Sequence, residues 1–484
     1  MSSVSSPASQ PLHPGFVHSA STPSTAKVLK GLLHKDYTLH HCFFNDKGFH
    51  NHLGHHLVAA YDLGAPVTLL QMIYDNEHPM LLPVDRQGQD ITEANWTKRL
   101  GEHRAYGSYL AFFTEQITTK GVPDTVKNFV MAPEANGNGA LMLARLVGGA
   151  LHPLLEIGFG VEFGQDYMVA QGLAMGAVTE PDFLNFVTDE SSGIPEITIT
   201  SKGVTLLSLL REVYDSEILK PLPYVPDVMD NDMGRFQKLT ENPERGAEIQ
   251  RIYAKWFIDT TLTGAAAEQE FANKAEECFW QATLLIAATG RPGRAPRADF
   301  FLMHILTSAI CIPSLLSILS DPIHKAQFLQ AYARASAIYL LLRGRPRIDI
   351  PLLLSYTEFP RPLAHVAPGG PDAQGDPSVG GETDPWISII RNALHHKEAH
   401  VAKVVRTLYY CAQRYGLKEA GSAIGAQDEE GRETHVGAAA MDGTIFVRAA
   451  GMVSDSLGWV AYGGKEGSWD RTSLGWDEAW ENEK

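Results

Sequence analysis

The sequence predicts a mainly α-helical fold: one large helical bundle-like domain followed by a small irregular or β-containing C-terminal region. Apolar residues recur every three or four positions over long segments such as 140–155 and 386–415, and this spacing is typical of amphipathic helices. Capping residues and prolines mark helix ends between these segments. The chain has 484 residues, of which 44% are hydrophobic, so it can bury a large core.

Further helices are predicted along the chain. Residues 51–61 begin at Asn51, a favourable N-cap, and the helical pattern ends at Gly64. Residues 247–288 and 321–342 also carry a helical pattern.

Residues 301–319 are apolar enough to suggest a membrane span. They contain His304, several hydroxyl side chains and Pro313, and an aspartate flanks them on each side. We therefore predict a buried helix that is broken near Pro313.

The predicted boundaries follow shifts in composition. Residues 1–25 are rich in Ser and Pro without the pattern of a secretory signal, so we expect a disordered N-terminal lead. Residues 26–415 form the helical domain, with an exposed loop at 366–385 where Gly, Pro and Asp are dense. Residues 416–484 are expected to form a cap region packed on the same domain, and the apolar run 444–447 suggests a hairpin.

Charge and cysteine content disfavour several classes of function. The formal net charge of −16 disfavours a nucleic-acid partner and an anionic membrane surface. The four cysteines are far apart in the chain, which argues against disulfides or a thiolate metal site and fits the reducing cytoplasm. Phosphate-loop, dinucleotide-binding, nucleophile-elbow and HExxH motifs are all lacking, so we expect no cofactor-binding motif of these kinds. The 19 histidines supply most of the metal-ligand capacity.

Three histidines share one face of the helix predicted at 51–61. His52, His55 and His56 lie at positions i, i+3 and i+4. A metal site and a polar surface are both compatible with such a cluster. His52 lies in the first turn, where the helix dipole disfavours imidazolium and keeps a ring nitrogen free to bind a metal.

Two other histidines stand alone in apolar helices. His152 and His304 are each surrounded in sequence by apolar residues, and a buried imidazole needs a polar partner. A backbone carbonyl is one such partner for each ring. A shared buried ion would satisfy both rings at once.

The fourth element carries two histidines and a lysine. His396, His400 and Lys403 lie at i, i+4 and i+7, on a face that borders the apolar stripe of the predicted helix. A solvated basic face is the simplest interpretation. A lysine buried beside histidines would favour its neutral amine, which can react with carbon dioxide to give a carbamate with an anionic oxygen.

The same residues resemble the motifs of the questin-oxidase-like family, whose members include fungal oxidases of anthraquinone and aflatoxin-type pathways. Four segments are similar to four family motifs in the same order, and the similarity extends to Trp459 and to 475–477. The four segments are 51–65, 149–154, 300–308 and 398–403.

The family resemblance implies a mainly helical fold and, in one branch, non-haem iron held by four histidines and a carboxylated lysine. Carried over to this sequence, His396 matches no ligand and is expected beside the ligands. The implied metal ligands are His52, His152, His304, His400 and carboxylated Lys403.

The resemblance further implies an oxidoreductase that uses O₂ to open a ring of an anthraquinone-like aromatic polyketide at buried Fe(II). Questin oxidase activity is NADPH-dependent, so one alternative is a metal-free, NADPH-dependent Baeyer–Villiger-type monooxygenase on the same substrate class. A second alternative is a non-catalytic helical binding protein whose histidines are core polar groups.

The implied ligand set has consequences for the substrate. Imidazoles with one oxygen donor suit iron better than magnesium or calcium. Five ligands leave one octahedral position for O₂, so we expect the substrate beside the metal in an apolar, aromatic pocket. Candidate pocket residues, several of which could equally be core residues, are Phe43, Phe44, Tyr106, Phe112 and Phe113.

Overall fold

The computed structural model describes residues 11–18, 21–45, 47–86, 90–181, 184–188, 193–195, 204–225, 229–362 and 384–481. Helices are the main regular structure of the described residues, which contain isolated β-bridges but no strand. The predicted mainly α fold is therefore confirmed. The described part of the C-terminal region, which was expected to be irregular or β-containing, has isolated β-bridges at Asp470 and between Gln427 and Glu433 but no strand.

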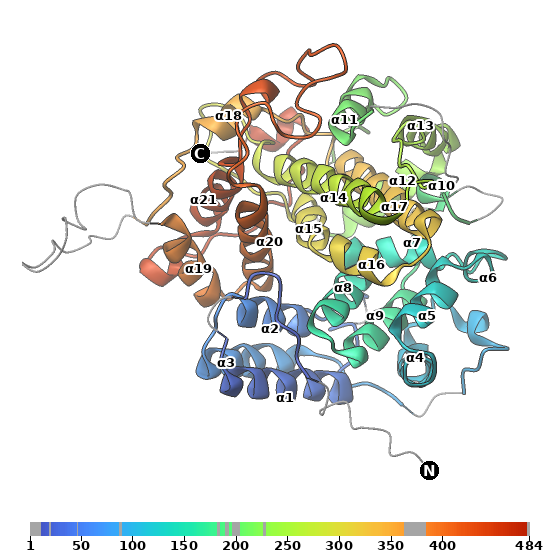
Figure 1. Ribbon diagram of the computed structural model, residues 1–484. Helices are drawn as coiled ribbons and strands as arrows, with labels where there is room; N and C mark the ends of the chain where they lie inside the picture. The colour runs from blue at the N-terminus through green and yellow to red at the C-terminus, as the bar shows by residue number, and fades with distance from the viewer. Residues whose placement is uncertain are drawn as a thin grey trace, which may run out of the picture.

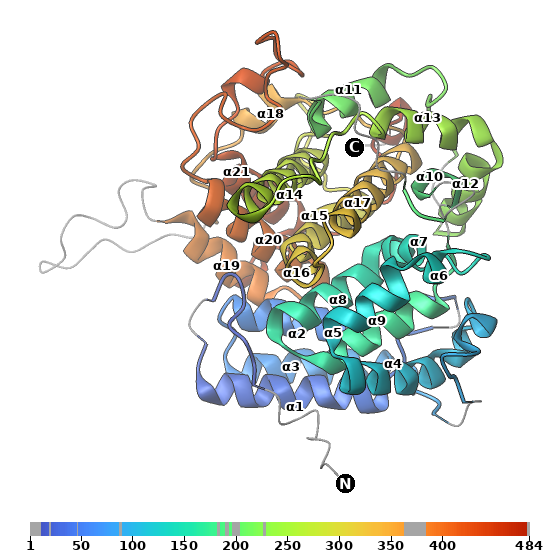
Figure 2. The ribbon, with the colours of Figure 1, turned by 45° about the vertical axis from the view of Figure 1, so that its right-hand side comes forward.

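The α-helices, most of which are labelled in Figures 1 and 2, are in chain order α1 (Pro23–Leu39), α2 (Leu53–Asp62), α3 (Val67–Glu77), α4 (Tyr106–Lys120), α5 (Val122–Val126), α6 (Pro133–Asn136), α7 (Met142–Val147), α8 (His152–Phe163), α9 (Asp166–Val178), α10 (Leu184–Val187), α11 (Leu206–Asp215), α12 (Met229–Glu241), α13 (Pro243–Tyr253), α14 (Gly264–Ala287), α15 (Phe300–Ala309), α16 (Cys311–Ile318), α17 (Pro322–Leu342), α18 (Ile350–Ser355), α19 (Pro385–His395), α20 (Ala399–Tyr415) and α21 (Ile445–Leu457). Short 3₁₀ or π turns lie at His78–Met80, Trp96–Arg99, His103–Ala105, Lys127–Met131, Gly149–Leu151, Ala438–Ala440, Val460–Tyr462 and Asp477–Trp480.

Four helices that are distant in sequence form a closed ring of contacts. Helix α2 packs against α8 and α20, and α15 packs against the same two helices. Around this ring, α1 and α3 cover α2, α9 and α16 cover α8, α14 and α17 cover α15, and α19 and α21 cover α20 (Figures 1 and 2). The ring is thereby enclosed, and it is the part of the fold that positions the candidate site.

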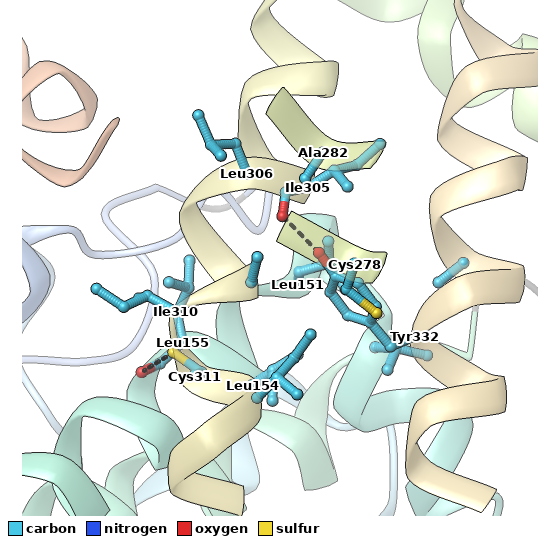
Figure 3. Close-up of a cluster of buried hydrophobic side chains, with 14 of the residues drawn as sticks. Leu151, Leu154, Leu155, Cys278, Ala282, Ile305, Leu306, Ile310, Cys311 and Tyr332 are labelled. Carbon is cyan, nitrogen blue, oxygen red and sulfur yellow. Dashed lines mark hydrogen bonds between the residues drawn. The ribbon is translucent and has the colours of Figure 1, made fainter. Parts of the chain in front are cut away.

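An apolar cluster fixes α15 within this arrangement. Leucines of the α8 region and aliphatic side chains of α15 pack against α14, α16 and α17 (Figure 3). Burying one such side chain contributes about 1.5–3 kcal/mol. The Tyr332 hydroxyl of α17 donates to the carbonyl of Ile305 at 2.6 Å, and the Cys311 thiol approaches the carbonyl of Leu155 at 3.8 Å. These contacts hold α15 in register with α8.

The apolar segment predicted to be a broken buried helix has that form. Helix α15 ends at Ala309 and α16 begins at Cys311, with an angle of 42° between them. Pro313 has no N–H to donate to the carbonyl of Ala309, so the break falls before the proline. Within the described ranges no single helix is long and apolar enough to cross a membrane, and only this bent pair has the length and composition when taken together.

Two predicted continuous helices are interrupted. The segment 140–155 divides because Gly149, Ala150 and Leu151 have φ values of 52°, 52° and 65°, a left-handed turn that ends α7 and restarts the chain at α8. The segment 386–415 divides at residues 396–398, where His396 is extended and its Nδ1 accepts the N–H of Glu398 at 3.1 Å. Apolar periodicity continues across both breaks, so it did not reveal them.

The expected disordered lead of residues 1–25 is wrong for its described part. Helix α1 already begins at Pro23, capped by the Thr22 hydroxyl. The Val17 side chain is buried, and its backbone N–H donates to Asp62 at 3.1 Å. A backbone contact with a buried carboxylate thus holds part of this segment against the helices.

The hairpin expected at 444–447 is also wrong, because these residues begin α21, which packs against α14, α19 and α20. Their apolar run is followed by helix-forming residues such as Arg448 and Ala449, which extend the helical pattern. The exposed loop expected at 366–385 lies almost wholly outside the described residues, which resume at Asp384, the N-cap of α19.

Candidate metal centre

Four histidines meet inside the helical ring, one at each of its four helices. Their ligand nitrogens all lie within 4.8 Å of one another. His152, His304 and His400 are buried, and His52 is partly exposed at the start of α2. The structure therefore brings together the four predicted histidines.

A hydrogen bond on Nδ1 aims each buried ring. His152 donates to the carbonyl of Gly149 at 2.7 Å, and His304 donates to the carbonyl of Phe300 at 2.8 Å. His400 donates to the Glu398 carboxylate at 2.7 Å. Because each of these partners can only accept, Nδ1 carries the proton and Nε2 keeps a lone pair toward the cluster.

The Nε2 atoms are spaced as neighbouring ligands would be. His52 Nε2 lies 3.0 Å from His152 Nε2, and two adjacent nitrogens bound at about 2.1 Å from one ion are separated by about 3 Å. In the described chain, Nε2 of His304 and of His400 is buried without a hydrogen-bond partner. Each unpaired buried acceptor costs about 1–3 kcal/mol, which a shared cation would offset.

The electrostatics keep the imidazoles neutral. Burial lowers the pKa of His52, His152 and His304 well below the usual value, and the neighbouring histidines and Lys403 lower it further. Burial likewise lowers the pKa of His400 to about 4, although Glu398 opposes this shift. Neutral rings are the form that binds metal ions.

Lys403 lies on α20, three residues after His400. Its side chain is 1% exposed, and its Nζ is buried without a hydrogen-bond partner among the described residues. Burial lowers its pKa to about 8, against the opposing effects of Glu398, Glu77 and Glu156. A substantial fraction of the amine is therefore neutral near pH 7.5.

The turn before His152 has a strained backbone and supplies the carbonyl that the His152 ring binds. Left-handed backbone costs about 1–2 kcal/mol for each non-glycine residue, and Ala150 and Leu151 both adopt it. The turn directs the carbonyl of Gly149 at the His152 ring. A Cβ on Gly149 would lie 2.9 Å from the ring of His50, which stacks on His152 at 4.3 Å between centroids. Local strain of this kind is concentrated at functional sites.

The other candidate histidines lie outside the four-nitrogen cluster. His55 Nε2 lies 2.7 Å from the carboxylate of Glu156, and His56 pairs with the carboxylate of Glu77. His396 Nε2 donates to the carbonyl of Leu457 at 3.0 Å. The geometry thus assigns His52, and not His55 or His56, to the four-histidine cluster. The spacing of the three residues in the sequence left this choice open.

Glu398 is a residue of the site that was not among those predicted from the sequence. Its carboxylate accepts from His400 and also from the indole N–H of Trp469. The position of Glu398 at the N-cap of α20, two residues before a histidine, was the available signal. Trp469 offered none, because it is 69 residues from His400 in the chain.

Only part of the predicted aromatic pocket lies near the centre. Phe43 contacts His50, which stacks on His152. Phe112 and Phe113 instead pack against Phe129 in the core. Tyr106 packs against His41, and Phe44 stacks on Phe49.

Phe300 was not among the expected aromatic residues, yet its ring lies beside two of the four histidines. Its centroid lies 5.0 Å from that of His304 and 5.6 Å from that of His400. It is partly exposed, and the Arg471 guanidinium lies 3.5 Å from its ring centroid.

Fold and site together define a mainly helical protein in which four histidines, three of them buried, meet as neutral imidazoles. A family model described as questin oxidase-like matches residues 49–408, a span that includes all four histidines and Lys403. The chain belongs to this family. The resemblance inferred from the motifs is thereby confirmed, and so is the expectation of an oxidoreductase.

Curated relatives match over most of their length. The chain is 26% identical to a questin oxidase of Aspergillus fumigatus over 90% of this chain and 92% of the relative. It is 25% identical to a Baeyer–Villiger monooxygenase of Cryptosporiopsis sp. over 96% and 98% of the two chains. It is also 25% identical to a questin oxidase of Aspergillus terreus over 82% and 83%. These names favour an enzyme over a non-catalytic binding protein.

Proposed function

We propose that this protein uses O₂ to open a ring of an anthraquinone-like aromatic polyketide at Fe(II), held by four histidines and carboxylated Lys403. The observation that carries the proposal is the convergence of four neutral imidazole nitrogens from four helices within 4.8 Å. The names of the relatives support the reaction class. The proposed ligands are His52, His152, His304, His400 and Lys403.

The donor set fits a first-row transition metal. Imidazoles suit iron, zinc and copper, whereas magnesium and calcium prefer oxygen ligands. Bound Fe(II) supplies the redox chemistry by which O₂ reacts with an organic substrate. The protein contributes the rings, whose Nδ1 hydrogen bonds set their direction before the ion arrives.

Carboxylation of Lys403 would complete the ligand set. The neutral amine attacks the carbon of CO₂, a C–N bond forms, and one proton is released, leaving a carbamate anion. The lowered pKa of Lys403, about 8, supplies the neutral amine. The new oxygen would place a negative charge among neutral rings and offset the charge of the cation.

The substrate is proposed to approach beside His52 and Phe300, which are the partly exposed members of the site. The part of the Phe300 ring that the Arg471 guanidinium leaves open is proposed to contact the aromatic substrate close to His304 and His400. The remaining histidines are buried, which keeps bulk water away from the reacting atoms.

Metal analysis tests the proposal. Purified protein loaded anaerobically with Fe(II) is expected to hold one equivalent, and His152→Ala and His304→Ala should lose it. The exposed His395 provides the control His395→Ala, which should retain the metal. Full retention in His152→Ala and His304→Ala would contradict the proposal.

A matched pair of lysines tests the fifth ligand. Lys403→Ala should lose iron or bind it at least 10-fold more weakly, as expected for a lost ligand. Lys397→Ala should bind iron like the wild type because Lys397 is exposed on the turn before α20. An equal loss in both variants would rule out Lys403 as a ligand.

The metal-free alternative predicts a different result. A Baeyer–Villiger-type monooxygenase that needs only NADPH would oxidise the polyketide after exhaustive chelation, with NADPH consumed in proportion to product. Retained turnover without metal would establish that alternative, and loss of turnover that Fe(II) restores would exclude it.

A further inference from the structure

A short C-terminal segment, residues 469–471, lies against two of the four helices that carry the histidines. The backbone N–H of Phe300 donates to the carbonyl of Asp470 at 2.8 Å, and the N–H of Asp470 donates to the carbonyl of Ala298 at 2.7 Å. Arg297 also binds the Asp470 carboxylate at 2.8 Å. The segment is thereby attached to the first residue of α15, one turn before His304.

The same segment reaches α20 through Trp469. Its side chain is 6% exposed, and its indole N–H donates to Oε2 of Glu398. The other oxygen, Oε1, accepts from Nδ1 of His400 at 2.7 Å. Because both oxygens are bonded, the carboxylate plane is fixed, and with it the direction of the His400 ring.

Arg471 completes the contacts of this segment. Its guanidinium lies 3.5 Å from the ring centroid of Phe300, whose neighbours include His304 and His400. Stacking of a cation on an aromatic face is favourable. The segment therefore contacts the surroundings of both histidines from outside the helical ring.

We propose that Trp469 is a positioning residue of the metal centre, acting through Glu398 on His400. This inference rests on the proposed function, since it assigns a role toward the same ion. Trp469 lies beyond residue 408, where the match to the family ends, so the centre depends on a part of the chain that the match does not cover. The expected effect is that of losing an outer hydrogen bond to a ligand, about 10–100-fold in metal affinity.

The variant Trp469→Phe keeps an aromatic ring and removes the indole N–H. Titration of the metal-free protein with Co(II) against a competing chelator should show affinity about 10-fold or more below that of the wild type. The visible spectrum of bound Co(II) should also change, because the His400 ring is no longer held in one orientation. The control is Trp459→Phe. It removes an indole hydrogen bond of 2.7 Å to the Asp455 carboxylate, which bonds none of the four histidines, and it should leave affinity and spectrum unchanged.

A double-mutant cycle separates positioning from packing. If Trp469 acts through Glu398, Trp469→Phe should have no further effect on affinity in a Glu398→Ala background. Additive losses would show that Trp469 does not act through Glu398 and would overturn the inference, as would wild-type affinity in Trp469→Phe alone. If wild-type protein binds neither Co(II) nor Fe(II), the proposed function fails together with the inference.

Discussion

Two buried cations on α20, one turn apart, have opposite surroundings. Arg406 is fully buried, and its guanidinium binds Asp62 at 2.8 Å and also Glu162. Lys403 is equally buried, but its amine has no hydrogen-bond partner among the described residues. The described residues thus supply carboxylate partners to Arg406 but no hydrogen-bond partner to Lys403.

The Arg406 group is completed by the N-terminal segment. Backbone N–H groups of Phe16, Val17 and His18 donate to the two carboxylates at 2.7, 3.1 and 2.8 Å. Two negative charges therefore meet one guanidinium and three backbone donors. Among the described residues only Nη1 of Arg406 and Oε2 of Glu162 lack a hydrogen-bond partner in this cluster. Paired charges of this kind are typical of a structural ion cluster, whereas the amine of Lys403 has no hydrogen bond.

The pKa values of the two cations follow this difference. Burial lowers the pKa of Arg406, but Glu162 and Asp62 more than reverse the effect and leave the value above its usual range. Burial dominates at Lys403 and lowers its pKa to about 8. Equal burial thus stabilises a charge at one position and destabilises it at the other, according to the partners present.

The largest expected effect on the free energy of unfolding is that of replacing Arg406. Arg406→Met leaves Asp62 and Glu162 buried without their partner, and we expect the metal-free protein to lose about 3–5 kcal/mol of unfolding free energy. Urea denaturation measures this loss. The control Arg414→Met, at an exposed position of the same helix, should change stability by about 0.5 kcal/mol or less. A loss below about 1 kcal/mol in Arg406→Met would break the comparison.

Replacing Lys403 should change the free energy of unfolding in the opposite direction. Lys403→Met in metal-free, CO₂-free buffer is expected to raise the unfolding free energy by up to about 3 kcal/mol, because a pKa lowered from 10.5 to about 8 carries a penalty of this order. In the wild type the penalty is complete below pH 8 and disappears as the pH rises toward 10.5. The gain from Lys403→Met should therefore shrink between pH 8 and 10, and a constant gain would contradict the assignment.

A smaller effect sharpens the role of the N-terminal segment. Gly15→Ala would place a Cβ 2.3 Å from the Asp62 carboxylate, so the segment must shift and weaken its hydrogen bonds. We expect a loss of about 1–2 kcal/mol with unchanged Co(II) affinity. Gly31→Ala is the control: nothing lies within 4 Å of its Cβ in helix α1, and the change should stabilise by about 0.5–1 kcal/mol. Weakened Co(II) binding in Gly15→Ala would show that the two groups are coupled.

Predictions from the sequence succeeded where the signal was local. His152 and His304 stood out because a single histidine in an apolar helix needs a polar partner. The helical periodicity around them was equally visible. Prediction of helix ends from apolar periodicity failed at two places. Left-handed backbone angles interrupt the helix at Gly149–Leu151, and a side-chain hydrogen bond accompanies the break at His396, while the apolar pattern continues across both.

The sequence by itself determined the helical class, the five candidate ligands and their resemblance to one family, because composition, periodicity and ordered motifs are properties of the chain read from end to end. Only the tertiary structure decided that His52 and not His55 joins the cluster, that Glu398 turns inward, and that Trp469 reaches it. These outcomes depend on distances between atoms whose residues are far apart in the chain. Such distances are set by how α2, α8, α15 and α20 pack, and no single segment encodes that packing.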